Sequence, residues 1–158
     1  MLEVKQCTSE EANGFIRCLV GQQLNYGFKF ADMDLYILGF ADKPVQNRTE
    51  CAYTIHHTTG MEVYWKDKKK RVVYDWDTPQ DVFHTDMQEL LGLSIKRVAL
   101  SDKNDFWLDL GVCYMVICTP EDGEESWRLL TPNKGPHLVA SDLWMETHSL
   151  MNEEDSTF

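Results

Sequence analysis

The histidines of this 158-residue chain are the first candidates for chemistry, and their spacing argues against a metal site. His56 and His57 are adjacent in a predicted strand, where neighbouring side chains point to opposite faces, so the pair is poorly placed to bind one metal ion. The other histidines lie far apart, without the HxxxH or HExxH spacing that places two ligands on one helix face. We therefore expect no metal or other cofactor. His56 and His57 are kept as candidate residues of a small-ligand pocket between sheet and helix.

The five cysteines are not expected to provide a nucleophile or a structural zinc site. Their number is odd and no CxxC pair occurs, and burial of Cys113 and Cys118 in an apolar strand would raise the pKa of both thiols. Free thiols are typical of a reducing compartment, and the first residues lack the apolar core of a signal peptide. GxSxG, P-loop and GxGxxG motifs are absent. The sequence predicts a non-enzymatic, cytoplasmic protein, with an unrecognised enzyme as the alternative.

Negative charge is concentrated in the second half of the chain. The protein has 26 acidic and 15 basic residues, a net charge of −11. Divided after Pro79, the first part has 10 basic and 11 acidic residues and the second has 5 and 15, so the net charges are −1 and −10. Four carboxylates fall in one predicted turn, at Glu121, Asp122, Glu124 and Glu125. This turn is either a solvated hairpin tip or part of an acidic face that steers a basic partner.

Trp127 and Arg128 follow the acidic turn and belong to residue types that are enriched in interfaces. They are candidate partner-binding anchors if they are exposed; the alternative is that Trp127 belongs to the core. The acidity of the chain argues against nucleic-acid binding, since the only basic cluster is the turn 66–71. No apolar run is long enough to span a membrane, and self-association through an exposed strand edge is left open.

Two helices are predicted from their start and stop signals. Thr8 and Glu11 have the spacing of a capping box, and helical periodicity follows up to Gly21. The second helix opens with Thr78 as its N-cap and ends at Gly92. The acids of the preceding segment 75–77 suit the positive end of the helix dipole. The residues expected to face inward are Val82, Phe83, Met87, Leu90 and Leu91.

The remaining chain alternates apolar and polar residues, as strands with one buried face do. We predict a hairpin at 24–40 that turns around Ala31 and Asp32, a three-stranded meander at 53–75, four strands within 95–131 and a possible last strand at 137–145. The expected fold is α+β, with about eight or nine antiparallel strands in a strongly bent sheet or two packed sheets, and two covering helices. Residues 1–151 form a single domain in this prediction, and 152–158 a frayed acidic tail.

Four short segments carry a resemblance to known proteins. The segments 19–23 (LVGQQ), 31–40 (ADMDLYILGF), 53–56 (YTIH) and 124–130 (EESWRLL) together resemble a group of uncharacterised small bacterial proteins, some of whose relatives resemble immunity proteins of polymorphic toxin systems. Where those proteins often carry a Cys-Pro-Trp-Arg-like stretch, this chain has 58–62 (TTGME), so no role of that stretch is carried over. The resemblance implies no catalytic residues. Together with the concentration of negative charge in the second half of the chain, it favours a binding protein of the immunity type whose acidic C-terminal half blocks a basic protein such as a nuclease toxin.

Overall fold

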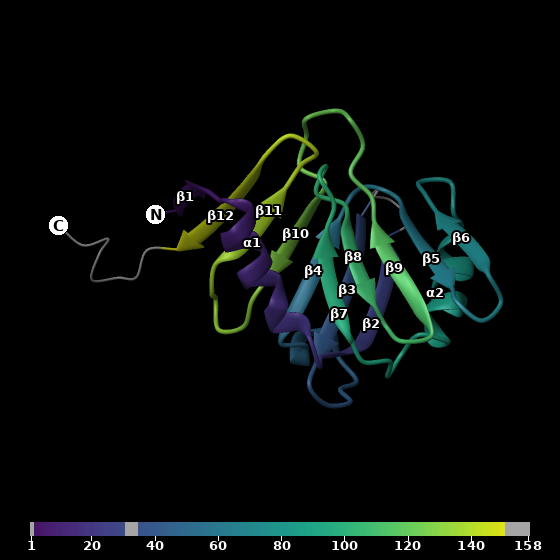
Figure 1. Ribbon diagram of the computed structural model, residues 1–158. Coiled ribbons are helices and arrows are strands. Elements are labelled where there is room, and N and C mark those ends of the chain that lie inside the picture. Colours follow the sequence, from purple (N-terminus) through teal and green to yellow (C-terminus); the bar gives the residue numbers. More distant parts are fainter. Residues whose placement is uncertain (1, 31–34, 151–158) are drawn as a thin grey trace.

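The structure is a computed structural model that describes residues 2–30 and 35–150. This part of the chain contains two antiparallel sheets, which we call sheet A and sheet B, and two short α-helices (Figure 1). The predicted antiparallel α+β class is therefore confirmed, with two sheets rather than one bent sheet. The predicted turn at Ala31 and Asp32 and the predicted acidic tail 152–158 lie outside the described residues.

Sheet A has seven strands and sheet B five, so the described residues form twelve strands instead of the expected number of about eight or nine. In spatial order, sheet A consists of β1 (Leu2–Gln6), β12 (Met145–Leu150), β11 (His137–Ala140), β10 (Trp127–Leu130), β4 (Tyr53–His57), β3 (Leu35–Ala41) and β2 (Gln23–Phe30). Sheet B consists of β6 (Lys70–Tyr74), β5 (Met61–Trp65), β9 (Cys113–Ile117), β8 (Phe106–Asp109) and β7 (Arg97–Leu100). The strands missed include β1, whose partner β12 lies at the far end of the sequence.

The chain crosses between the sheets where the sequence predicts continuous meanders. The expected meander 53–75 is wrong in this respect, because β4 lies in sheet A between β3 and β10, whereas β5 and β6 lie in sheet B. Gly60 stands at the crossing, where a Cβ atom would come within 2.9 Å of the Tyr74 carbonyl oxygen. The strands of 95–131 are divided too, since β7, β8 and β9 belong to sheet B and β10 to sheet A. Alternation identifies a strand but not the sheet that contains it.

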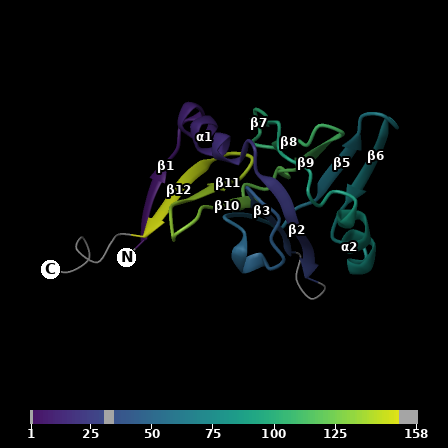
Figure 2. The same cartoon turned by 90° about the horizontal axis from the view of Figure 1, so that it is seen from below.

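The first helix, α1 (Ser9–Ile16), begins as predicted. Thr8 Oγ1 accepts a hydrogen bond from Glu11 N at 3.1 Å, and Glu11 Oε1 accepts one from Thr8 N at 3.3 Å, which completes the capping box. The chain continues as a 3₁₀ helix, η1 (Arg17–Leu19). Figures 1 and 2 show α1 over the part of sheet A formed by β12 and β11, beside the β7 edge of sheet B. Ala12 and Ile16 are its buried residues.

The second helix, α2 (Gln80–Gln88), starts one residue later than predicted. Its N-cap is Pro79, because Thr78 Oγ1 accepts a hydrogen bond from Asp75 N at 2.8 Å and so belongs to the preceding turn. α2 packs on β2. Of the five residues expected to face inward, Phe83, Met87 and Leu90 are buried, whereas Val82 and Leu91 are exposed. The apolar stripe of α2 is therefore narrower than its sequence suggests.

A single hydrophobic core joins the two sheets and both α-helices. Trp127 of β10 packs against Phe106 of β8, with the ring centroids 4.7 Å apart, and so links sheet A to sheet B. A short 3₁₀ helix, η2 (Arg48–Glu50), lies between β3 and β4. No helix within 2–30 or 35–150 is long and apolar enough to cross a membrane.

Candidate functional site

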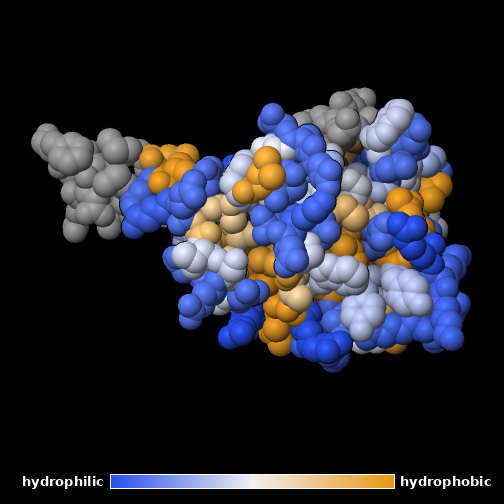
Figure 3. Space-filling model, turned by 45° about the horizontal axis from the view of Figure 1, so that its top comes forward, coloured by the Kyte–Doolittle hydropathy of each residue, from blue (hydrophilic) through white to orange (hydrophobic). Residues whose placement is uncertain are grey.

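Five loops meet at one end of the two sheets, and we call this region the loop end. They are 58–60, 75–78, 101–105, 118–126 and 141–144; the fourth and fifth stand at the top of Figure 1. Thr119 Oγ1 donates to the Lys103 carbonyl oxygen (2.6 Å), and Thr59 Oγ1 donates to the Cys118 carbonyl oxygen. The loop 118–126 is thus connected to the loops 101–105 and 58–60. With the top turned forward, this face shows many hydrophilic residues and apolar patches between them (Figure 3).

The predicted acidic turn has a defined conformation within the loop end. Asp122 Oδ1 accepts a hydrogen bond from Glu124 N (2.9 Å), and Gly123 adopts a positive φ of 73°. Gly123 N donates to Asp142 Oδ1 and its carbonyl oxygen accepts from Trp144 Nε1, both at 2.9 Å. The turn between β9 and β10 is therefore bound to the turn between β11 and β12, and the positions of its carboxylates are fixed relative to sheet A.

Three of the four predicted acidic residues line one groove. Asp122, Glu124 and Glu125 lie along a groove of about 370 Å³ together with Asp75 and Trp76, which come from the segment before α2. The Trp76 residue is 73% exposed. Sequence reasoning assigned the acids of this segment to the helix start and did not consider the tryptophan. A large aromatic residue in a turn, outside any apolar periodicity, was the available signal.

Two of the four acidic residues have basic partners in the same chain. Glu121 forms an ion pair with the exposed Lys103, whose ammonium group lowers the pKa of the Glu121 carboxyl. Glu125 Oε1 lies 2.8 Å from Arg128 Nη2. Asp122 and Glu124 have no ion-pair partner among the residues that the structure describes. The carboxylates open to a new cation are therefore these two, which both face the groove.

Trp127 is a core residue rather than an exposed anchor. Its side chain is completely buried, and its indole Nε1 donates a hydrogen bond to the Asn104 carbonyl oxygen at 2.8 Å. Trp127 was a candidate contact only if it was exposed, and it is buried. Trp127 instead supports the loop end from below, because Asn104 also donates from Nδ2 to the Ser141 carbonyl oxygen at 2.8 Å.

Arg128 and His56 lie directly opposite each other in β10 and β4, on the face of sheet A that points away from Trp127. The guanidinium bonds Glu125 through Nε and Nη2, and its Nη1 lies 3.3 Å from His137 Nδ1. Burial, and then the positive charges of Arg48 and other nearby basic groups, lower the pKa of His56. The Arg128 guanidinium is thus engaged within the chain, and His56 is partly buried opposite it in the same sheet.

His57 points into the core and is enclosed there. Its ring stacks on Tyr36 with a centroid distance of 4.8 Å, and Nδ1 donates to the Thr59 carbonyl oxygen at 2.8 Å. Its Nε2 is buried without a hydrogen-bond partner among the described residues. Burial lowers the pKa of His57 to about 4, so the ring is neutral at neutral pH. The groove begins at the next residues, Thr58 and Thr59, and neither histidine lines it.

No arrangement for metal binding or thiol chemistry occurs in the described part of the chain. Within it, no three His, Cys, Asp or Glu side chains are grouped to hold a metal ion, and all five cysteines are free. Cys118 lines the groove, but burial, followed by the charges of Glu62 and Asp105, raises the pKa of its thiol to about 11. A thiol with this pKa is almost fully protonated at neutral pH and is a weak nucleophile.

Comparison with known proteins gives no relative: no family model, no curated protein and no solved structure matches this chain. The resemblance to immunity proteins of toxin systems is therefore still a prediction. What the chain does has to be argued from the loop end itself.

Proposed function

We propose that this protein binds a basic protein partner at the loop end and inhibits it by covering its surface, as a non-enzymatic protein of the immunity type. The groove that joins Asp122 and Glu124 to Trp76 is the observation that carries the proposal. The Glu124 carboxylate has no hydrogen-bond partner among the described residues, and Asp122 uses one oxygen within the turn. Both are available to a lysine or arginine of the partner.

Trp76 adds a second kind of recognition to the same groove. An exposed indole attracts a cation over its ring face, most strongly where the cation is partly removed from water. Tryptophan and arginine are also the residue types that contribute most to binding energy at protein interfaces. A basic side chain of the partner that lies between Trp76 and the Asp122 and Glu124 carboxylates would satisfy both preferences.

The charge of the surrounding loops favours a basic partner. The five loops contain one basic residue, Lys103, and nine acidic ones. The acidic ones are Asp75, Asp77, Asp102, Asp105, Glu121, Asp122, Glu124, Glu125 and Asp142. A surface with this imbalance attracts a positively charged protein from a distance and accelerates its association, and salt weakens this effect. A partner of the nuclease-toxin kind, with a basic substrate-binding face, has the complementary charge.

The test uses the toxin-like protein encoded beside this one, if its gene has such a neighbour, and measures association rates by surface plasmon resonance over a series of NaCl concentrations. The double variant Asp122→Asn with Glu124→Gln should lower the association rate at low salt by about tenfold. The control variant Asp42→Asn with Asp67→Asn removes the same charge from two exposed loops, after β3 and after β5, at the opposite ends of these strands, and should have little effect. An association rate that is indifferent both to salt and to the loop variant contradicts the proposal.

A further inference from the structure

A second surface, which shares no lining residue with the groove at the loop end, exposes aromatic residues that the core does not use. Trp107 in β8 is 41% exposed, although its neighbours Phe106 and Leu108 are completely buried. The strand alternation therefore turns Trp107 to the outer face of sheet B. On that face it lies directly opposite Ala99 of β7 and Val116 of β9, and its ring meets the ring of Tyr114 edge to face at 6.2 Å.

Arg97 of β7 is held next to this tryptophan by a buried carboxylate. Its Nε and Nη2 donate to Asp109 Oδ2 at 3.0 and 2.9 Å, while Asp109 Oδ1 accepts from Lys66 Nζ (2.8 Å) and Gly111 N (2.9 Å). Burial alone would raise the pKa of Asp109, but these hydrogen bonds outweigh it and lower the pKa. The carboxylate therefore stays ionised and fixes the guanidinium in one orientation.

The fixed guanidinium still has an unused edge. Its Nη2 is also within 3.5 Å of the Tyr114 hydroxyl, whereas Nη1 makes no hydrogen bond to any described residue. The Arg97 side chain is 72% exposed, so this edge is open to a ligand. Together with Lys66, Arg97 gives the site two positive charges against the one negative charge of Asp109, on a protein whose net charge is −11.

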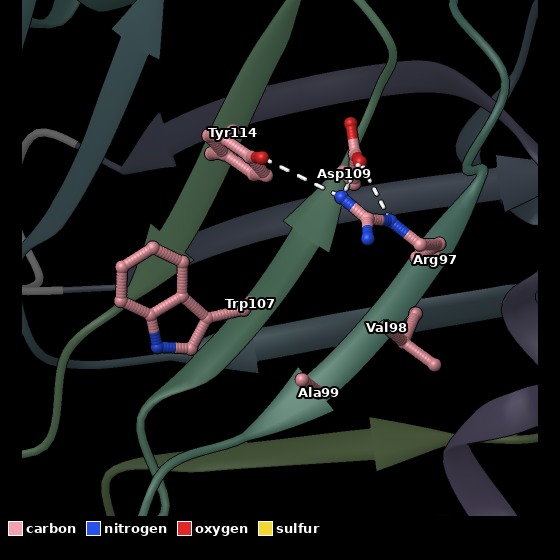
Figure 4. A pocket seen from close by; sticks show the side chains of 6 residues that line it. All are labelled: Arg97, Val98, Ala99, Trp107, Asp109 and Tyr114. Carbon is pink, nitrogen blue, oxygen red and sulfur yellow. Dashed lines mark hydrogen bonds and ion pairs between the residues drawn. The ribbon is translucent and has the colours of Figure 1, made fainter.

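Trp107, Arg97 and their neighbours enclose a groove of about 290 Å³. Figure 4 shows the indole projecting from β8 on one side of the groove and the guanidinium reaching from β7 toward Asp109 and Tyr114 on the other. The lining residues are Arg97, Val98, Ala99, Trp107, Asp109 and Tyr114. The groove thus has apolar walls and a flat ring on one side, and hydrogen-bond donors with a positive charge on the other.

We propose that this groove binds a small molecule that has a planar aromatic ring and an anionic group. The ring lies against the Trp107 indole and the Ala99 side chain opposite it, where apolar surfaces exclude water. The anionic group accepts hydrogen bonds from Arg97 Nη1, which its bond to Asp109 has already oriented. An aromatic carboxylate and a nucleotide share this chemistry. The site is independent of the loop end, so either proposal can fail without the other.

The test is a titration of the full-length protein, followed by ¹H–¹⁵N NMR at the Trp107 indole N–H and the Arg97 Nε–H. Indole-3-acetate represents the aromatic carboxylates and adenosine monophosphate the nucleotides; we expect saturable shifts of both signals with at least one of them. Indole alone and acetate alone, which each offer half of the recognised chemistry, should bind at least about tenfold more weakly. Binding of only one of the two ligands supports the proposal and identifies the anionic group.

Variants separate recognition from fold stability. Trp107→Ala and Arg97→Gln should each weaken binding about tenfold, and Arg97→Lys, which keeps the charge but not the planar fork, should fall between. Trp76→Ala removes an exposed tryptophan from the loop end and should leave the affinity unchanged. Thermal unfolding of each variant confirms that it is folded. The proposal is overturned if neither ligand causes a saturable shift, if indole binds as tightly as indole-3-acetate, or if Arg97→Gln binds like the parent protein.

Discussion

The imidazole of His57 is enclosed by protein, and this makes the stability of the fold depend on pH. The ring lies against Tyr36 and is 1% exposed, with a pKa of about 4 in the folded state. In the unfolded chain a histidine has a pKa of about 6.5. As pH falls through the interval between these values, the unfolded state takes up the proton before the folded state does. The His57 contribution is thus fully present above about pH 6.5 and is lost as pH falls toward 4.

We expect this loss to amount to about 3 kcal/mol of unfolding free energy between about pH 7 and pH 4. Urea denaturation at intervals of pH measures it. His57→Phe keeps a ring against Tyr36 but cannot take up a proton, so its stability should fall less steeply over the same range. His56 and His137, whose pKa values are also lowered by burial, contribute to the residual slope, and Asp109 and Glu121, whose pKa values their basic partners lower, add to it near pH 4. Equal slopes for the variant and the parent protein would show that His57 is not the group responsible.

The tryptophan residues show that residue type alone does not identify a candidate contact residue. The sequence places Trp127 next to the acidic turn, and it is buried; Trp76 and Trp107 were not considered as contacts, and both are exposed. Strand alternation predicts that neighbours point to opposite faces, but it does not say which face meets the core. For β10 that choice depends on its pairing with β4, which is distant in sequence. β8 pairs with its sequence neighbours β7 and β9, and its inner face is set by the packing of sheet B on sheet A, where Phe106 meets Trp127.

Two glycines, one in a strand and one in a helix, give opposite predictions for substitution by alanine. Gly27 of β2 lies under α2, where a Cβ atom would come 2.8 Å from Met87 Cγ, and Met87 is completely buried. Gly27→Ala should therefore destabilise the fold by about 1–3 kcal/mol through overpacking. Gly14 lies within α1, and a Cβ atom there would meet nothing within 4 Å beyond the backbone of its own helix and the adjacent residues. Gly14→Ala should stabilise the fold by about 0.5–1 kcal/mol, because alanine favours the helix.

Chemical denaturation of both glycine variants measures the two changes, and each serves as the control for the other. A loss of stability in both would mean that alanine disturbs α1 as well. If Gly27→Ala has no effect, α2 can move away from β2, and the packing of this helix contributes little to the core.

The elements that local signals specify were predictable, and those that depend on distant pairing were not. The capping box at Thr8 identifies α1 because the signal and its hydrogen bonds lie within four residues. The prediction of Thr78 as the N-cap was wrong because its hydroxyl accepts a hydrogen bond from Asp75 N in the preceding turn. This turn positions Asp75 at the edge of the groove. β1 has a single buried or half-buried position and depends on the ladder to β12, which periodicity along one segment does not reveal.

The sequence divides the net charge of the molecule into −1 before and −10 after Pro79, but only the fold shows where the carboxylates lie on the surface. Folding brings the acids of the turn between β9 and β10 next to Asp75 from the first half, so the division after Pro79 is not a division of the surface. β4 and β10 are also paired with each other. The two sets of predicted residues therefore lie side by side: the histidines of β4, and the acidic turn with β10, the strand that follows it. Both consequences come from sheet pairing and were not available from counts along the sequence.

The concentration of carboxylates at the loop end should reduce the stability of the free protein, because like charges repel in the folded state more than in the extended chain. Neutralising Asp122 and Glu124 removes part of this repulsion. The double variant Asp122→Asn with Glu124→Gln retains the acceptor that bonds Glu124 N and should therefore raise the urea midpoint at low salt, by less than Gly14→Ala does. The gain should disappear at high salt, since the screening length is about 10 Å at 0.1 M and shorter above it.

Glu3→Gln with Glu10→Gln removes charges that are favourable, one beside Lys5 and one in the first turn of α1, and should give no gain. A stabilised double variant that also associates more slowly with the basic partner would show that the same carboxylates serve binding at a cost in stability. A gain that persists at high salt would instead indicate a change in loop packing, and the electrostatic account of the loop end would be wrong.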